Sequence, residues 1–346
     1  MPGHPAQPHV PRRRGAALVC LLAFATLALG GCESIMVMTG ARMRLDGVPL
    51  QAIAASMPGN GGIAPGGKAT LSIVATTPDG RTLATVGTGD GKVLLDSYRF
   101  DARVVKVNAD GVVTLPADPH LSESLTPHVR ITAIGQATPV ADLDIPVRYD
   151  VAFAGSYRGT DGFNGSDGFD GMAGSMSSMG SFDPNNPSAG GDGGDGGDGT
   201  NGTNGGDGDN GGSGPAVHVA IALVAGARQL LHVRANASGK DQDFIVDPDG
   251  GSLTITASGG YGGQGGRGGA GGAGGSGGSG TGNPGRPGSD GRSGQDGFPG
   301  TAGTITVTID PAAAPYLDRF RFKNVDGSGR PGPAPVITTA PVASPW

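Results

Sequence analysis

Apolar and polar residues alternate with a period of two over much of this chain, which predicts a mainly β protein. Between residues 69 and 76, Leu71, Ile73 and Ala75 face one way and Thr70, Ser72 and Thr76 the other, the pattern of a strand with one buried face. The same pattern, interrupted by Pro, Asp and Gly turn signals, predicts eight short strands in the first part of the chain. These are Leu50 to Ala55, Ala69 to Thr76, Thr82 to Val86, Val93 to Phe100, Val104 to Val107, Val112 to Leu115, Val129 to Ile134 and Leu143 to Tyr149.

A second set of strands is predicted further along, and a long glycine-rich insertion interrupts it. The set comprises Ala216 to Val224, Gln229 to Ala235, Asp243 to Asp247, Ser252 to Ala257, Thr304 to Ile309 and Tyr316 to Phe322. We expect one half-buried antiparallel sheet in which the first four strands form a meander. In that arrangement the first strand begins and the fourth strand ends at the same end of the sheet. Both glycine tracts would therefore leave the sheet from one end.

Glycine recurs at every third residue for long runs in two tracts, residues 159–214 and 259–303. A period of three matches an extended helix of the polyproline-II (PPII) type, in which the glycines line one edge and allow close neighbours. Three interpretations stay open: a bundle of extended segments, a collagen triple helix and a disordered loop. The Gly-Gly-X portion from Gly262 to Gly280 leaves two edges bare. It resembles the glycine-rich bundles of certain phage tail adhesins and insect antifreeze proteins.

The strand pattern and the tracts together predict the domain organisation. Seven or eight short strands within roughly 100 residues are typical of an immunoglobulin-type (Ig-like) β-sandwich. The run from Val104 to Leu115, followed by Val129 to Ala133, resembles the bacterial Ig-like repeats of surface adhesins, a likeness that implies a spacer. We expect a tether at 32–47, an Ig-like β-sandwich at 48–153, an acidic glycine-rich tract at 154–215, a second small antiparallel β domain at 216–326 with a glycine-rich insertion at 258–303, and a disordered tail at 327–346.

The first 31 residues have the pattern of a signal peptide. A basic patch, Arg12 to Arg14, precedes an apolar run from Ala16 to Leu29, and the sequence Leu-Gly-Gly-Cys ends at Cys32. That ending resembles the lipobox of bacterial lipoproteins, which implies that Cys32 carries the lipid (palmitate) and becomes the first mature residue. In that family Glu33, in place of Asp, implies the outer membrane, facing the periplasm or the cell surface. The membrane would then be a partner through the N-terminal lipid.

Composition narrows the function further. The chain has 69 glycines among 346 residues, far above the roughly 7% of ordinary proteins, so it can bury only modest cores. Its 24 basic and 30 acidic residues give −6, and removal of a signal peptide with three arginines gives −9. This acidity disfavours a nucleic-acid partner. The one other cysteine, Cys20, lies in the segment to be removed, so the mature chain has no disulfide.

The acidic tract carries the candidate metal chemistry. Its nine Asp residues include the calcium candidates Asp192, Asp195, Asp198, Asp207 and Asp209, and the tract resembles calcium-binding nonapeptide repeats in its Gly and Asp content. At three residues per turn, successive carboxylates would lie roughly 9 Å apart, too far for one ion to chelate two. A solvated acidic face is therefore the preferred interpretation.

Other candidate sites are weaker. His218 and His232 fall on adjacent predicted strands and could be neighbours on a polar face, but a metal would need a third ligand. Gly274 to Gly278 matches the G-x-S-x-G nucleophile pattern only because the repeat consists of Gly and Ser. We therefore expect no catalysis and no cofactor, with calcium as the one candidate ion. The sequence indicates a lipid-anchored surface protein with structural or adhesive contacts to cell-surface, matrix or glycan partners. The alternative is a module that binds calcium, a glycan or ice through the Asp/Gly repeat face.

The lipidation prediction can be checked directly. Cells that produce the wild-type chain should incorporate labelled palmitate into it, and the Cys32→Ala variant should incorporate none, because the acylated thiol is gone. Equal labelling of the two proteins would contradict the assignment.

Overall fold

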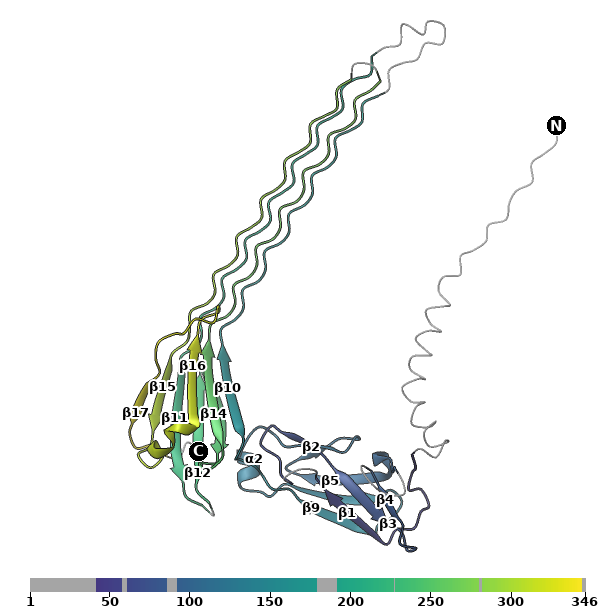
Figure 1. The fold of residues 1–346 in the computed structure, drawn as a ribbon, viewed down its shortest axis with the longest axis vertical. Helices are drawn as coiled ribbons and strands as arrows, with labels where there is room; N and C mark the ends of the chain where they lie inside the picture. Colours follow the sequence, from purple (N-terminus) through teal and green to yellow (C-terminus); the bar gives the residue numbers. More distant parts are fainter. Residues whose placement is uncertain are drawn as a thin grey trace, which may run out of the picture. The chain divides into compact units, whose positions relative to one another are not determined.

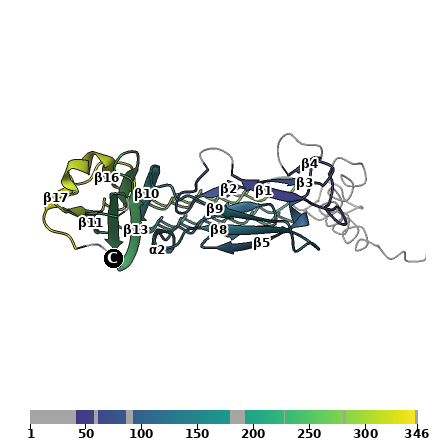
Figure 2. The ribbon, with the colours of Figure 1, turned by 90° about the horizontal axis from the view of Figure 1, so that it is seen from below.

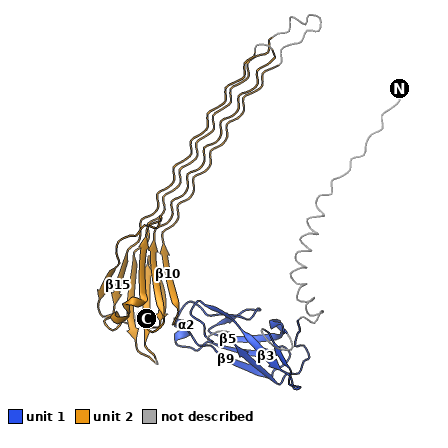
Figure 3. Cartoon of the chain, viewed as in Figure 1, with its two compact units in different colours: residues 1–148 blue, residues 149–346 orange. Residues whose placement is uncertain are grey.

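The computed structural model describes residues 42–57, 61–85, 92–178, 192–226, 228–279 and 282–343. The chain divides after Arg148 into two compact units (Figure 3). Both units are mainly β, as the alternation predicts. The signal segment and Cys32 lie outside the described residues. Within the described residues, no helix is long and apolar enough to cross a membrane.

Unit 1 consists of three small antiparallel sheets, ordered β1-β3-β4, β5-β8-β9 and β2-β7-β6. In Figure 2 the strands β1, β3 and β4 lie over β5, β8 and β9 as two layers. The elements are β1 (Ala52–Ser56), β2 (Lys68–Thr70), β3 (Ser72–Thr76), β4 (Thr82–Ala84), the 3₁₀ turn η1 (Leu95–Ser97), β5 (Tyr98–Arg103), β6 (Lys106–Val107), β7 (Val112–Thr114), the short α2 (His120–Glu123), β8 (His128–Ala133) and β9 (Val140–Asp144).

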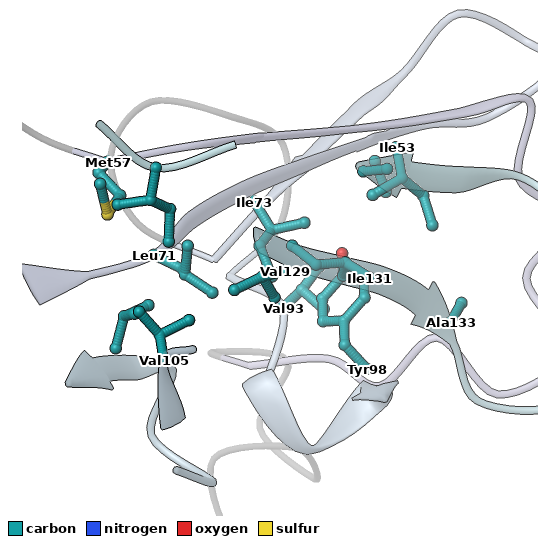
Figure 4. Packing of buried hydrophobic residues seen from close by; sticks show 14 of the residues in the cluster. Ile53, Met57, Leu71, Ile73, Val93, Tyr98, Val105, Val129, Ile131 and Ala133 are labelled. Carbon is teal, nitrogen blue, oxygen red and sulfur yellow. The ribbon is translucent and has the colours of Figure 1, made fainter. Parts of the chain in front are cut away.

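The core of unit 1 is formed by the inward-facing residue of each alternating pair. Ile73 of β3 and Ile131 of β8 are completely buried and lie in the same cluster as Ile53 of β1 and Tyr98 of β5 (Figure 4). Each fully buried Ile, Leu or Val contributes about 1.5–3 kcal/mol relative to an exposed one. This cluster therefore holds the layers together.

Unit 2 contains two sheets from which the glycine-rich segments emerge (Figure 1). One sheet has five strands in the order β13-β12-β11-β15-β17, and the other has three in the order β10-β14-β16. The elements are β10 (Ala152–Arg158), β11 (Val217–Val224), β12 (Leu230–Ala237), β13 (Lys240–Val246), β14 (Ser252–Ser258), β15 (Ile305–Ile309), the 3₁₀ segment η3 (Ala314–Arg319), β16 (Phe320–Val325) and β17 (Val336–Thr339).

The two sheets share one hydrophobic core. Ile221 of β11, Val233 of β12 and Val307 of β15 lie in the same buried cluster as Leu253 and Ile255 of β14. Most residues between them along the strands are less buried, as the period-two pattern predicts, although Ala222 and His232 are buried on the opposite face of the sheet. Two sheets packed around one core form a stable layered structure, from which the glycine-rich segments extend.

The pairing within unit 2 corrects the prediction of one antiparallel sheet. β14 is not the fourth strand of a meander with β11, β12 and β13; it lies in the other sheet, parallel to both β10 and β16. β15 is likewise parallel to β11. Parallel neighbours need a long crossover connection, and the glycine tracts supply it. Counting alternating strand directions predicts at which end a tract leaves the sheet. It does not reveal that the segment after each tract joins a different sheet from the segment before it.

Two strands were missed by the sequence interpretation. β10 falls partly in the predicted acidic tract, and β17 falls in the predicted disordered tail, where it pairs with β15. All four residues of β17 are exposed, including Val336 and Ile337, so its sequence lacks the alternation of apolar and polar residues that predicts a half-buried strand. The tail is therefore ordered at β17 because the edge of β15 accepts it.

Candidate functional site: the glycine bundle

Four extended segments run side by side out of unit 2 (Figure 1). We call them leg 1 (159–178), leg 2 (192–214), leg 3 (259–279) and leg 4 (282–303). Legs 1 and 3 continue from β10 and β14, and legs 2 and 4 lead into β11 and β15. Each tract is thus one long hairpin, and its two ends belong to different sheets.

Main-chain hydrogen bonds join the legs at every turn. The N–H of Gly162 in leg 1 donates to Tyr261 of leg 3, and that of Gly206 in leg 2 donates to Ser166 of leg 1, both at 2.8 Å. Gly266 of leg 3 donates to Gly206 of leg 2 at 2.8 Å. The same contacts repeat every three residues, and equivalent bonds join leg 4 to legs 2 and 3. Legs 2 and 3 are therefore central, with three neighbours each, while legs 1 and 4 have two.

The register of the sheets continues into the legs. Ala152 of β10 lies opposite Ser252 of β14, an offset of 100 residues, and Asp170 of leg 1 still contacts Ala270 of leg 3 at that offset. Val217 of β11 pairs with Ile305 of β15, an offset of 88. The same offset of 88 connects legs 2 and 4 along their length. The bundle is thus registered by the strands at its base.

The number of neighbours explains where glycine is needed. A Cβ atom on Gly269 of leg 3 would lie 2.0 Å from the carbonyl oxygen of Phe169, and one on Gly268 would lie 2.0 Å from that of Gly291. Leg 3 touches three neighbours and has two glycine rows, the Gly-Gly-X pattern. Legs 1 and 4 each have a single glycine row, which includes Gly168 and Gly291 respectively and faces two neighbours. Side chains are excluded where backbones meet and allowed elsewhere.

The row of leg 2 that faces leg 1 contains both glycines and larger residues, and the residue type at a position depends on the side chain opposite in leg 1. A Cβ on Gly212 would lie 2.6 Å from the Thr160 hydroxyl of leg 1. Where leg 1 carries Phe169, leg 2 carries Thr203, whose Oγ1 accepts the Phe169 amide proton at 2.6 Å. Thr200 does the same for Met172 at 2.7 Å. At these three contacts a hydroxyl from one leg or the other fills the space, whereas Asp209 and Phe163 meet through the main chain.

Asp and Asn side chains form a second ladder. Twelve of them accept a hydrogen bond through Oδ1 from a main-chain N–H of the neighbouring leg at 2.6–2.9 Å: Asp161, Asn164, Asp167, Asp170, Asp195, Asp198, Asn201, Asn204, Asp207, Asn210, Asp290 and Asp296. The sequence interpretation missed the Asn residues. The signal was that Asn and Asp occupy the same position of the three-residue repeat. The two side chains can replace each other there because both have an Oδ1 atom that accepts a main-chain N–H.

This ladder changes the meaning of the calcium candidates. Asp195, Asp198 and Asp207 each place one carboxylate oxygen on an amide of leg 4. Asp192 is exposed at the far end of leg 2, and Asp209 belongs to the row that faces leg 1. No group of three or more metal-ligating side chains occurs among the described residues. The structure therefore shows the carboxylates of Asp195, Asp198 and Asp207 as part of the bundle's own hydrogen bonding.

The remaining sequence candidates are separated. His218 lies opposite Asn236 and His232 lies opposite Ala222, so the two histidines lie on one face of the sheet but four positions apart along the strands, and His232 is buried. The prediction that they could be near neighbours is wrong because this register places Asn236, and not His232, across from His218. Ser276, within the G-x-S-x-G match, lies on extended leg 3 and its carbonyl accepts the amide proton of Ser177. It has no strand-turn-helix setting.

Large apolar side chains stand out from the legs. Phe163 is 81% exposed, and Phe169, Met172, Met176 and Phe298 are similarly exposed. At the base, the Arg158 guanidinium lies 4.0 Å from the centre of the Tyr261 ring and pairs with Asp161 at 2.6 Å. Aromatic rings on the outward rows offer apolar faces on which a ligand could stack.

Comparisons with known proteins provide no relatives for this arrangement: no family model, no curated protein and no solved structure matches the chain.

Substituting alanine for glycine should separate two kinds of glycine. Gly269→Ala places a methyl group on the Phe169 carbonyl, and overpacking of this kind costs ~1–3 kcal/mol, so the amides around it should exchange with solvent about tenfold faster or more. Gly194→Ala is the matched control, since the nearest atom is the Ser177 Cβ at 4.0 Å. Hydrogen exchange followed by NMR would check this. Equal protection in both variants would contradict the packing.

Removing one hydrogen bond from this ladder of Asp and Asn side chains (the Asx ladder) should mainly affect the amide that donates it. Asp198→Ala deprives the Arg286 amide of its acceptor, at a cost of about 1 kcal/mol, and exchange of that amide should speed up several-fold. Asp198→Asn keeps the acceptor oxygen and should retain most of the protection, although it removes the charge. If the Asn and Ala variants behave alike, the carboxylate acts by charge and the ladder has no role.

Proposed function

We propose that the protein is a non-enzymatic, lipid-anchored component of the cell envelope that displays a polyglycine-II-type bundle for structural or adhesive contacts. In chain order it has a lipid anchor at Cys32, an Ig-like spacer and the glycine bundle. The observation that carries this proposal is the hydrogen bonding of each leg to two or three neighbours, in register with the sheets below.

That bonding supports a stiff projection. One leg cannot slide past another without breaking a series of main-chain bonds at 2.7–3.2 Å, and the parallel strands hold the same register at the base. At about 3.1 Å per residue, legs of some twenty residues reach ~65 Å from the sheets. A rod of this length holds the outward rows clear of the sheets at its base, as a display or adhesive element requires.

The spacer role of unit 1 is supported by its composition of small antiparallel sheets around one core. These sheets agree with the Ig-like interpretation drawn from the strand spacing. Such a unit would separate the bundle from the membrane. The outer membrane is the location that the residues around Cys32 favour.

A second candidate function, a ligand-binding module, is favoured by the exposed rings on the bundle. Among the ligands considered, calcium competes with amides that already use one oxygen of Asp195, Asp198 and Asp207. An ice-binding face would have to be flat, and Phe163 and Phe169 project from leg 1. A glycan suits rings and amide groups on one surface.

A cell-attachment experiment tests the main proposal. Cells that display the wild-type protein should be labelled by an antibody without permeabilisation and should attach to surfaces or to one another more than cells without it. At equal surface labelling, Gly269→Ala should lower attachment because the bundle is disrupted, whereas Gly194→Ala should leave it unchanged. Antibody access only after permeabilisation, or equal attachment of the Gly269→Ala cells, would argue against an adhesive display role.

A further inference from the structure

The base of the bundle contains a cavity that no role proposed so far uses. Its volume is about 550 Å³, within the range of small-ligand sites. The residues that line it include Tyr157, Thr160, Ser213, Ser238, Lys240 and Gln242. It lies where β10 and the β12–β13 hairpin meet the first turn of leg 1 and the last turn of leg 2. The lining is rich in hydroxyl groups and has two cationic side chains, Arg158 and Lys240. Because Arg158 already pairs with Asp161 at 2.6 Å, the composition suits a polar, uncharged ligand.

Tyr157 gives the cavity a fixed wall. Its hydroxyl donates to the Ala235 carbonyl at 2.9 Å. Burial, followed by the nearby Asp241 and Asp243, raises the pKa of Tyr157 to about 12, so this wall stays neutral at physiological pH. The cavity is thus built on the sheets, which hold it in shape.

The same surface continues up the bundle as a track of exposed rings. One turn above Thr160, Phe163 of leg 1 accepts the amide proton of Asp209 in leg 2 through its carbonyl. At this level Phe298 of leg 4 donates its amide proton to Asn210. Phe163 and Phe298, 81% and 76% exposed, therefore flank leg 2 at one height. Phe169 follows two turns higher.

Polar groups fill the spaces between the rings. Asn210, Asn204 and Asn201 each use Oδ1 on leg 4, which leaves Nδ2 to donate to a ligand. The rings are separated by polar positions, so they form no continuous apolar patch of the kind a protein partner would cover. Isolated rings with amides and hydroxyls between them match the alternating apolar faces and hydroxyl edges of pyranose sugars.

We propose that this cavity and track bind a linear oligosaccharide of β-linked hexopyranose units, with one end in the cavity and the following sugars stacked on Phe163. The inference rests on the proposed adhesive role and specifies its ligand class. The acidic Asp side chains on leg 2 disfavour a nucleic acid, whose phosphates they would repel. Neutral sugars carry no such penalty.

Titration of the mature, unlipidated chain with cellohexaose and chitohexaose tests the proposal. At least one of the two should bind with a Kd of about 1 mM or tighter and shift the NMR signals of Thr160, Lys240 and Gln242. Phe163→Ala should weaken binding about fivefold or more, and Phe163→Trp should restore it, because stacking needs a ring. The control is Met176→Ala, an equally exposed side chain on the other outward row of leg 1, which should bind like the wild type.

Three results would overturn the inference. They are no binding of either sugar, binding that Phe163→Ala leaves intact, or binding that shifts residues elsewhere and leaves the cavity unchanged. Circular dichroism and hydrogen exchange on each variant separate loss of the ring from loss of the bundle. A failure here would leave the adhesive role itself untouched, because surface labelling and the Gly269→Ala attachment test are independent of the ligand. Attachment that persists without sugar binding would then point to a protein partner.

Discussion

Close contact between glycine backbones is the constraint on which the bundle depends. Amide–carbonyl bonds at about 2.8 Å join neighbouring legs only because no Cβ stands between them. Ordering a residue costs roughly 1–2 kcal/mol of backbone entropy, and glycine costs the most. A single exposed hydrogen bond contributes about 1 kcal/mol, so an isolated leg would not stay ordered. Several bonds per turn, repeated along four legs, are needed to offset that cost.

The sheets of unit 2 supply the other part of the stabilisation. β10 and β14 pair in parallel and pass their offset of 100 residues to legs 1 and 3, while β11 and β15 pass 88 to legs 2 and 4. The legs therefore start in register and do not have to search for it. A buried core that includes Ile255 and Val307 holds those strands, which couples a conventional β interior to a bundle that has almost no apolar interior.

Because backbone contacts occupy the glycine rows, the outward rows are free to vary, and they hold the chemistry. The Asx ladder uses part of that freedom to satisfy amides that the glycine rows cannot reach, such as those of Arg267 and Arg286. What remains outward is a set of rings and amide groups above a hydroxyl-lined cavity. Structure and recognition are thus divided between different positions of the same three-residue repeat.

The sequence by itself determined the β character, most strand positions and the period of three in the glycine tracts, because periods of two and three reflect local backbone geometry. It left a bundle, a collagen triple helix and a disordered loop open for those tracts, and the tertiary structure decided for the bundle. It also indicated that Gly-Gly-X leg 3 has two bare edges. Only the tertiary structure decided that β14 lies beside β10, that β17 pairs with β15, and that Asp198 accepts an amide proton from Arg286. Those facts depend on which distant segments become neighbours, and a repeat of identical glycines carries no information on its partner or its register. The strands supplied that information by burying a shared core.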